Sequence, residues 1–293
     1  MTNKAEDIKQ RFAFDQADVR GCYVRLDQTC KAIQATHHYP PGLAELINQF
    51  TAAAVLLKDS IKADGSLTIQ MQTNSVIGLL MADCFSDGRV RAICEYDQQA
   101  IIVQDIDLSK QEGAVLAITI TPAEGERYQS FVPIEYANLS QCLEDYFSRS
   151  EQLPSKFKFF ATGDTVVGLS LHALPVQRIK DTQQSAQAFE HLSVLLDSLT
   201  PNEAHHDGAE EMLTKLFHAD HCRIFSSQKI QFGCECNAER SFSAIQSLGK
   251  DDIQSLIDET IAENNSTVTV DCHFCFQRYQ FSVSQLQHLI TGH

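Results

Sequence analysis

The sequence has no long uninterrupted apolar run and no common nucleotide-binding or hydrolase motif, and each absence excludes a class of protein. No stretch approaches the ~18 apolar residues of a membrane-spanning helix, so no membrane association is expected. The opening MTNKAEDIKQRFAF lacks a basic start followed by an apolar segment, so we predict a cytoplasmic protein without a secretory signal. We find no G-x-S-x-G elbow and no G-x-x-x-x-G-K loop, and we therefore expect a protein that is not an enzyme.

Positive charge is also scarce, above all in the C-terminal part of the chain. The net charge is −15, and residues 181–293 carry 16 acidic against 6 basic side chains, a net of −10. Proteins that bind nucleic acid normally present a basic surface, because contacts to phosphate dominate their affinity. The charge therefore argues against a nucleic-acid partner. The remaining composition, with 43% hydrophobic residues in 293, is typical of one large globular domain or two smaller ones.

The most informative feature that is present is a set of paired cysteines near the C-terminus. A C-x-C pair and a C-x-x-C pair are separated by 35 residues, and their members are Cys234, Cys236, Cys272 and Cys275. Two such pairs brought together by folding can place four thiolates around one ion, and an all-sulfur tetrahedral set favours Zn²⁺. Four protein ligands leave no position for water, so the site would be structural in the resting protein. The same sulfurs could instead be oxidised to disulfides, which makes metal binding and redox sensing the two interpretations to separate.

The other cysteines and the histidines have simpler interpretations. Five scattered cysteines lie in apolar or strand-like segments and are predicted to be small buried hydrophobic residues: Cys22, Cys30, Cys84, Cys94 and Cys142. Cys222 follows His221 and is harder to assign. Because four sulfurs already complete the coordination of zinc, His273, His218 and His221 are predicted to lie at the surface or around the ligands.

The N-terminal part predicts an α+β domain in which helices pack on an antiparallel sheet. Pro41–Ala63 reads as a long helix with apolar residues on more than one face, and Asn138–Ser150 as a second helix. Short strands with turn signals between them are predicted from Leu67 to Met71 and then at Val76–Ala82, Arg89–Tyr96, Ala114–Thr121 and Tyr128–Ile134. Consecutive strands with short connections favour antiparallel pairing.

A change of composition after Leu174-Pro175 predicts a helical linker. Phe189–Leu199 and Ala209–His218 are amphipathic at helical spacing, with a break predicted at Pro201–Gly208. We set the boundaries at residues 1–178 for the N-terminal domain, 179–231 for the linker and 232–293 for a small zinc-binding domain.

The C-terminal part predicts a compact unit around the cysteines. Asn237 is the expected N-cap of a helix, Ala238–Leu248, that buries Phe242, Ile245 and Leu248 and ends at Gly249. A second helix is expected from about Asp252, followed by strands at Ser266–Asp271 and Phe276–Val283 on either side of the C-x-x-C turn. A unit of some 60 residues with so few large apolar side chains would need an additional cross-link to fold stably, and bound zinc would provide one.

Several long segments resemble one known family, the 33-kilodalton heat-shock proteins, which are bacterial redox-regulated holdase chaperones. The C-terminal segments are QFGCECNAER, LGKDDIQSLIDE and VDCHFCFQRYQF, and the N-terminal ones include DVRGCYVRL, HHYPPGLAELINQFTAAAVLLKDSIKADGSLTIQMQ and RYQSFVPIE. The matches cover nearly the entire chain. Three departures stand out: the 35-residue spacer is longer than expected, Ile47-Asn48-Gln49 replaces the usual Leu-Gly-Glu, and Asn237 replaces the commoner Ser after the C-x-C.

The resemblance implies a mechanism. One Zn²⁺ would hold the four C-terminal cysteines as thiolates in the reduced protein. Hypochlorite, or peroxide with mild heat, would convert them to the disulfides Cys234–Cys236 and Cys272–Cys275, and the linker would open. Exposed apolar surface would then bind unfolding client proteins without ATP, and family members form homodimers when activated.

Two other classes remain open at this point. One is a constitutive protein-interaction module stapled by zinc. The other is a thiol-disulfide oxidoreductase, although a thioredoxin-like C-x-x-C should start a helix after a strand, and the pair at Cys272 does not.

Overall fold

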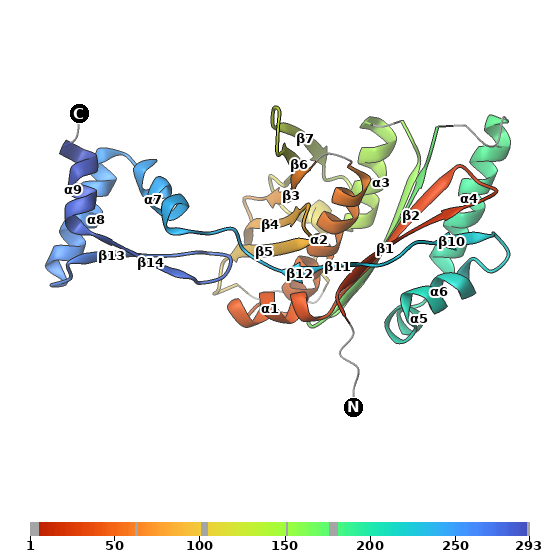
Figure 1. Cartoon of the computed structure of the whole chain (residues 1–293), viewed down its shortest axis with the longest axis horizontal. Helices are drawn as coiled ribbons and strands as arrows, with labels where there is room; N and C mark the ends of the chain where they lie inside the picture. Colours follow the sequence, from red (N-terminus) through yellow and green to blue (C-terminus); the bar gives the residue numbers. More distant parts are fainter. Residues whose placement is uncertain (1–5, 62–63, 101–104, 151, 176–180, 292–293) are drawn as a thin grey trace. The chain divides into compact units, whose positions relative to one another are not determined.

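The computed structural model describes residues 6–61, 64–100, 105–150, 152–175 and 181–291 (Figure 1). They divide into a first compact unit that ends at Gly233 and a second that begins at Cys234. No helix in these described ranges is long and apolar enough to span a membrane. The predicted α+β class is confirmed, but the prediction of one sheet in the N-terminal part was incomplete, because the first unit contains two.

The first sheet is antiparallel and is built from both ends of the first unit. Its strand order is β10-β1-β2-β9-β8, with β11 also paired to β1. The strands are β1 (Ile8–Phe14), β2 (Val19–Leu26), β8 (Ser155–Ala161), β9 (Val166–Ala173), β10 (Cys222–Ile224) and β11 (Gln228–Lys229). Strands β2 and β9 are buried on both faces, so their sequences lack the alternation from which the other strands were predicted.

The second sheet contains the strands that alternation predicted. Its order is β12-β5-β4-β3-β6-β7, and all its pairs are antiparallel except β12 with β5. The bounds are β3 (Gly65–Gln72), β4 (Ile77–Phe85), β5 (Arg89–Tyr96), β6 (Val115–Pro122), β7 (Tyr128–Pro133) and β12 (Gln231–Phe232). The short edge strand β12 comes from the segment just before the cysteine pairs.

Helix α2 (Pro41–Ser60) forms the centre of the first unit and matches its predicted start, but it ends at Ser60, since Ile61 is already extended; the predicted end at Ala63 lies outside the described residues. Pro41 occupies the first turn, where its missing N–H costs nothing. The helix contacts β2, β8 and β9 of one sheet and β3, β4 and β5 of the other. This position between two sheets explains why apolar residues occur on more than one of its faces. Helix α1 (Gln28–Thr36), the 3-10 helix η1 (Leu108–Lys110) and helix α3 (Leu139–Ser150) complete this part.

The linker helices cover the other face of the first sheet (Figure 1). Helix α4 (Thr182–Ser198) begins earlier than the apolar pattern suggested, because the Asp181 side chain caps its first turn. The break predicted at Pro201–Gly208 was wrong, because helix α5 (Pro201–His206) forms there. A capping box between Thr200 and Glu203 stabilises its N-terminus. Helix α6 (Ala209–Leu216) follows as expected.

The second unit consists of helices α7 (Ala238–Gln246), α8 (Lys250–Ala262) and α9 (Val283–Thr291) with the hairpin of β13 (Thr267–Asp271) and β14 (Arg278–Ser282). Its core contains Ile245, Ile253, Ile257, Val268, Phe281 and Leu286. Two details of the prediction were wrong. Leu248 is 44% exposed because α7 has already ended, and Gly249 is the N-cap of α8. The last strand begins at Arg278 because Phe276 adopts a left-handed conformation with φ 54°.

Candidate metal centre

The two cysteine pairs are presented by two different kinds of local structure. Cys234 and Cys236 lie in an extended segment that leads into α7. Asn237, the predicted N-cap, accepts a hydrogen bond from the backbone N–H of Arg240 at 2.8 Å, so the helix start is fixed directly after the C-x-C pair. The Arg240 side chain in turn binds the carboxylate of Glu235 at 3.0 Å, which ties down the residue between the two cysteines.

Cys272 and Cys275 lie in the tight turn between β13 and β14. The backbone N–H of Phe276 donates to the Cys272 carbonyl at 2.8 Å, and the N–H of Cys272 donates to the Gln277 carbonyl at 3.0 Å. The left-handed backbone of Phe276 allows the chain to reverse within this turn. The hairpin register, with Asp271 opposite Arg278, therefore holds the second pair at one end of a two-stranded ribbon.

Folding brings the four predicted sulfurs together. The Sγ atoms of Cys234, Cys236, Cys272 and Cys275 all lie within 4.8 Å of one another, and each residue is half-buried. Cys234 and Cys272 are 3.6 Å apart at sulfur, and Cys236 and Cys275 are 3.4 Å apart. Sulfurs bound tetrahedrally to zinc at ~2.3 Å would be separated by about 3.8 Å. The arrangement therefore fits a tetrahedral thiolate site, and within the described residues no histidine belongs to the cluster.

The electrostatics of the cluster favour a bound cation. Partial burial and the neighbouring sulfurs of Cys236 and Cys272 raise the pKa of Cys275 to about 12. Burial, with a contribution from Cys234, likewise raises the pKa of Cys272. Four crowded thiolates repel one another, whereas a divalent cation at their centre stabilises all of them in the deprotonated form. This donor set matches the preference of Zn²⁺ for sulfur.

Tyr279 is part of the site and was not predicted as such from the sequence. Its hydroxyl donates a hydrogen bond to the Cys236 sulfur at 3.2 Å, and this bond raises the pKa of Tyr279 to about 12. The residue lies on β14 opposite Val270, and its ring packs against the small core of the second unit. One signal could have found it: Tyr279 and Phe281 alternate on the strand that leaves the C-x-x-C turn, so both face the interior.

The scattered thiols belong to the first unit and lie in a different environment. All five that were predicted to be core residues are buried, namely Cys22, Cys30, Cys84, Cys94 and Cys142. Burial raises the pKa of each of these thiols, to about 12 for Cys84 and Cys94. Cys222 is half-buried, and burial, followed by Asp220 and Asp15, raises its pKa to about 12. None of these six thiols is therefore poised to react as a thiolate.

The linker forms a second apolar core with the first sheet. Leu192 and Leu196 of α4 and Leu213 of α6 pack on a sheet face that displays Phe12, Phe14, Tyr23, Val167, Leu169 and Leu171. Phe217, directly after α6, stacks on Phe12 with ring centroids 5.7 Å apart and meets Phe14 edge-on at 5.0 Å. The linker helices thus cover a continuous apolar surface, with aromatic rings at its centre.

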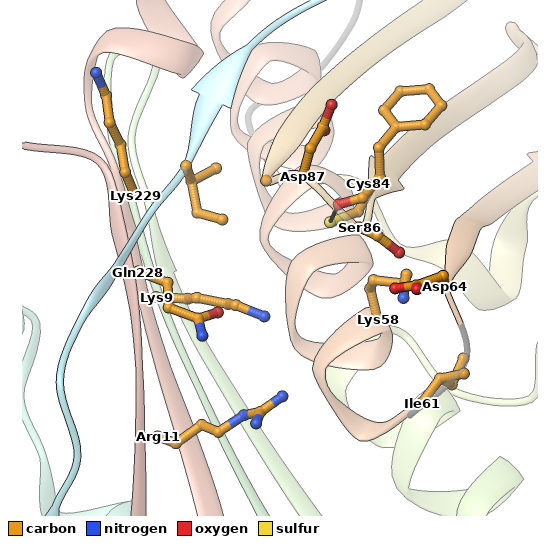
Figure 2. A pocket seen from close by; sticks show the side chains of 13 residues that line it. Lys9, Arg11, Lys58, Ile61, Asp64, Cys84, Ser86, Asp87, Gln228 and Lys229 are labelled. Atoms are coloured by element: carbon orange, nitrogen blue, oxygen red, sulfur yellow. Dashed lines mark hydrogen bonds between the residues drawn. The ribbon is translucent and has the colours of Figure 1, made fainter.

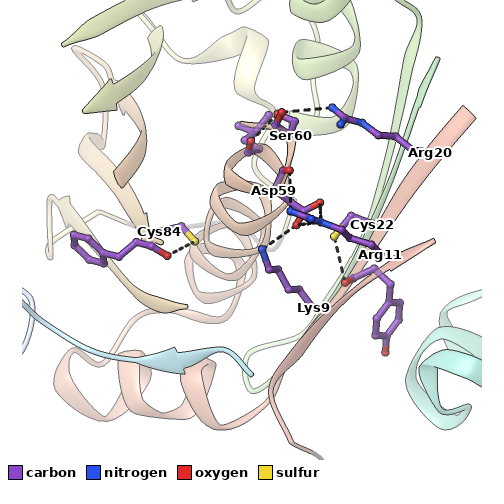
Figure 3. A network of polar contacts seen from close by, with 10 residues as sticks. Lys9, Arg11, Arg20, Cys22, Asp59, Ser60 and Cys84 are labelled. Atoms are coloured by element: carbon purple, nitrogen blue, oxygen red, sulfur yellow. Dashed lines mark hydrogen bonds and ion pairs between the residues drawn. The ribbon is translucent and has the colours of Figure 1, made fainter. Parts of the chain in front are cut away.

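After the helices, the linker returns along the edge of the first sheet and reaches the second. It borders a cavity of about 490 Å³ whose lining includes Gln228 and Lys229 of the linker and Lys58 of α2 (Figure 2). Lys9 and Arg11 of β1 also line this cavity, and both bind the Asp59 carboxylate at 2.8 Å (Figure 3). This ion-pair network fastens the end of α2 to β1, the strand on which β10 and β11 pair.

The fold and the cluster define a class of protein: an α+β unit with a helical cover, followed in the chain by a small unit built around four thiols. The model of the Hsp33 protein family matches residues 7–282. The chain therefore belongs to the Hsp33 family, as the resemblance of its segments predicted.

Similar proteins support this assignment along the whole chain. The 33 kDa chaperonin of Pseudomonas aeruginosa (strain UCBPP-PA14) is 39% identical over 289 residues, covering 98% of this chain and 95% of that protein. The 33 kDa chaperonin of Ectopseudomonas mendocina (strain ymp) is also 39% identical, over 287 residues, 98% of this chain and 96% of that protein. Both names describe a role that is not enzymatic. The crystal structure of the 33 kDa chaperonin of Thermotoga maritima has the same fold, with a TM-score of 0.79 at 19% identity over 97% of this chain and 98% of that one.

Proposed function

We propose that this protein is a redox-regulated, ATP-independent holdase chaperone. Its relatives' name supports the chaperone role, and one structural observation carries the regulation: a four-thiol cluster within a unit whose own core is small. Reduced and metal-bound, the protein would be inactive. Oxidative stress would activate it, and the active form would keep unfolding client proteins from aggregating in the cytoplasm.

In the reduced state, Cys234, Cys236, Cys272 and Cys275 act as thiolate ligands. Bound Zn²⁺ would supply the cross-link between the extended segment and the hairpin, and zinc contributes roughly 10–16 kcal/mol in small zinc domains. The thiolates hold their positions through the Asn237 cap and the β13–β14 register. A core of six buried apolar side chains is small for a unit of this length, so its folding depends on these ligands.

Oxidation would remove the ligand set. We assign the disulfides to the pairs that are close in sequence, Cys234–Cys236 and Cys272–Cys275. Two thiolates lose two electrons as one S–S bond forms. Hydrogen peroxide accepts these electrons as its O–O bond breaks, giving two hydroxide ions, and hypochlorous acid gives chloride and one hydroxide. Disulfide sulfurs lie ~2.05 Å apart, which is incompatible with the 3.8 Å spacing of a tetrahedral ligand set.

Unfolding of the second unit would then release the linker. We keep the boundaries 179–231 for this linker, between domains 1–178 and 232–293. The linker helices and Phe217 cover the aromatic face of the first sheet. Helices of 17, 6 and 8 residues are marginal on their own, so they depend on docking. Once undocked, both their apolar faces and Phe12 and Phe14 become available to unfolded clients. The activated form is expected to be a homodimer.

The test compares reduced, zinc-loaded protein with oxidised protein in a light-scattering assay of client aggregation. We expect suppression of scattering only after oxidation, together with loss of one zinc per chain. Equal suppression by the reduced form would favour a constitutive interaction module, and multiple turnover on a disulfide substrate would favour an oxidoreductase.

Site-directed variants test the ligand assignment itself. Changing any one of the four cysteines to Ser should weaken zinc binding sharply, because a tetrahedral site loses a quarter of its ligands. Full zinc occupancy in the double variant Cys272→Ser/Cys275→Ser would contradict the four-thiolate site.

A further inference from the structure

The hydrogen-bond donors around the cluster differ from one sulfur to the next. Backbone N–H groups of Phe274 and Cys275 donate to the Cys272 sulfur, and the N–H of Gln277 donates to the Cys275 sulfur. These donors belong to the turn and are fixed by its geometry. Cys236 lies in the extended segment, and a side chain, the hydroxyl of Tyr279, donates a hydrogen bond to its sulfur at 3.2 Å.

The hairpin holds that hydroxyl in position. Tyr279 lies on β14 in register with Val270 of β13, between Arg278, which binds Asp271 through two hydrogen bonds, and the strand residue Gln280. Its ring packs with the core of the second unit, so the hydroxyl is held at the sulfur by the hairpin. A donor held in this way hydrogen-bonds a thiolate more strongly than a neutral thiol, because bonds to charged groups are the stronger ones.

We propose that Tyr279 is a positioning residue that slows the oxidation of Cys236 and so sets the oxidant level at which the cluster reacts. The inference rests on the proposed redox function and assigns its threshold to one hydroxyl group. The reacting electrons are a lone pair on the thiolate sulfur. The Tyr279 hydroxyl donates into this electron density, which makes the sulfur a weaker nucleophile.

The step affected is the first one. The Cys236 thiolate attacks one oxygen of hydrogen peroxide, the O–O bond breaks, and a sulfenic acid and one hydroxide form. A second thiolate then displaces hydroxide from the sulfenic sulfur and completes the disulfide. Removing the Tyr279 hydroxyl accelerates the attack and leaves the second step and its products unchanged.

The test uses Tyr279→Phe, which removes the hydroxyl and keeps the ring in the core. Tyr128→Phe is the matched control, because Tyr128 is exposed on β7 and its hydroxyl contacts Ser130. Both variants and the parent chain are loaded with zinc. Initial rates of alkylation by N-ethylmaleimide are then measured separately for each cysteine by mass spectrometry, and peroxide-triggered zinc release is followed with a chromogenic chelator.

We expect Tyr279→Phe to raise the alkylation rate of Cys236 about threefold to tenfold, with a smaller change at the other three ligands, and to speed zinc release by a similar factor. Tyr128→Phe should match the parent chain. Equal rates at Cys236 in the parent chain and Tyr279→Phe overturn the inference. A uniform acceleration at all four cysteines, accompanied by faster amide exchange throughout β13 and β14, also overturns it, since that result means a structural role.

The outcomes separate the inference from the proposed function. A parent chain that binds no zinc, or that keeps its four thiols in excess peroxide, overturns the redox function and the inference with it. A parent chain that binds zinc and loses it to peroxide, at the same rate as Tyr279→Phe, leaves the redox function standing and overturns the role of Tyr279 alone.

Discussion

Phe217 offers a way to undock the linker without touching the thiols. Its side chain is 1% exposed, and its ring lies against both Phe12 and Phe14 of the first sheet. If docking of the linker keeps the protein inactive, Phe217→Ala should activate the reduced, zinc-loaded protein. This variant tests the role of the docked linker separately from that of the cysteine cluster, because the four cysteines remain unchanged.

The size of the effect follows from the packing. Truncating a buried Phe to Ala costs about 3–5 kcal/mol, through lost transfer free energy and the cavity left behind. The two aromatic contacts account for roughly 0.5–1.5 kcal/mol each within that loss. Since 1.36 kcal/mol is a factor of ten, the population of undocked linker should rise roughly a hundredfold to several thousandfold. Segments with short helices and few contacts open first, so the loss is expected to appear as local opening rather than global unfolding.

The assay combines amide hydrogen exchange with light scattering on reduced, zinc-loaded protein. We expect faster exchange in α4, α5 and α6, suppression of client aggregation without oxidant, and one zinc per chain as in the parent. Phe217→Leu keeps much of the side-chain volume, so its exchange rates and its suppression of aggregation should lie between those of the parent chain and Phe217→Ala. Val194→Ala is the control on α4, because Val194 is 62% exposed and its truncation should change little.

Two results would refute the reasoning. Unchanged exchange in the linker of Phe217→Ala would mean that this ring does not hold the helices in place. Faster exchange in the linker without any suppression of aggregation would mean that the surface under α4 and α6 is not where clients bind, and the proposed activation would have to work elsewhere.

The sequence allowed prediction of the parts whose signal is local. The cysteine spacing predicted which four sulfurs meet, Asn237 predicted a helix start, and alternation predicted strands β3 to β7. The first sheet was missed because its information is spread over the chain: β1 pairs with β10 more than 200 residues later, with Phe14 opposite Cys222. Strand β12 has only two residues and joins β5 in parallel, so no periodicity could have revealed it.

Side-chain partners across elements could not be predicted for the same reason. Asn48 is one of the positions at which a departure from the family is expected from the sequence, and the structure shows what it contacts: it is fully buried in α2, and its amide donates to the carbonyls of Thr162 and Gly163 in the β8–β9 turn. The contact between Tyr279 and Cys236 likewise depends on a hairpin register that the sequence indicates only as alternation. Spacing predicts which atoms can share an ion, whereas long-range packing decides which donors surround them.

Three further predictions concern the first unit. Asn48→Ala should lower the free energy of unfolding by about 1–3 kcal/mol in urea titrations, because the buried Asn48 amide makes two hydrogen bonds to the β8–β9 turn, while a loss as small as that of the exposed Asn202→Ala would contradict this role. Replacing the buried thiols with Ala or Val should leave zinc release by peroxide intact, and peptide mapping that finds one of them in the activating disulfide would overturn this; they are Cys22, Cys30, Cys84, Cys94 and Cys142. His172 tests the pH dependence: it is buried against the rings of Phe147 and Phe157, with Nδ1 at 2.8 Å from the Ser155 hydroxyl, and burial, followed by Arg20, lowers its pKa from 6.5 to about 4. Because the unfolded chain then takes up a proton at higher pH than the folded one, stability is fully present above pH ~6.5 and is lost as the pH falls toward ~4, by roughly 2–3 kcal/mol at pH ~4.5. Denaturant titrations at pH ~7 and ~4.5 should therefore show a weaker pH dependence for His172→Gln by that amount, and parallel curves for the variant and the parent would mean that this imidazole is protonated without cost in the folded protein.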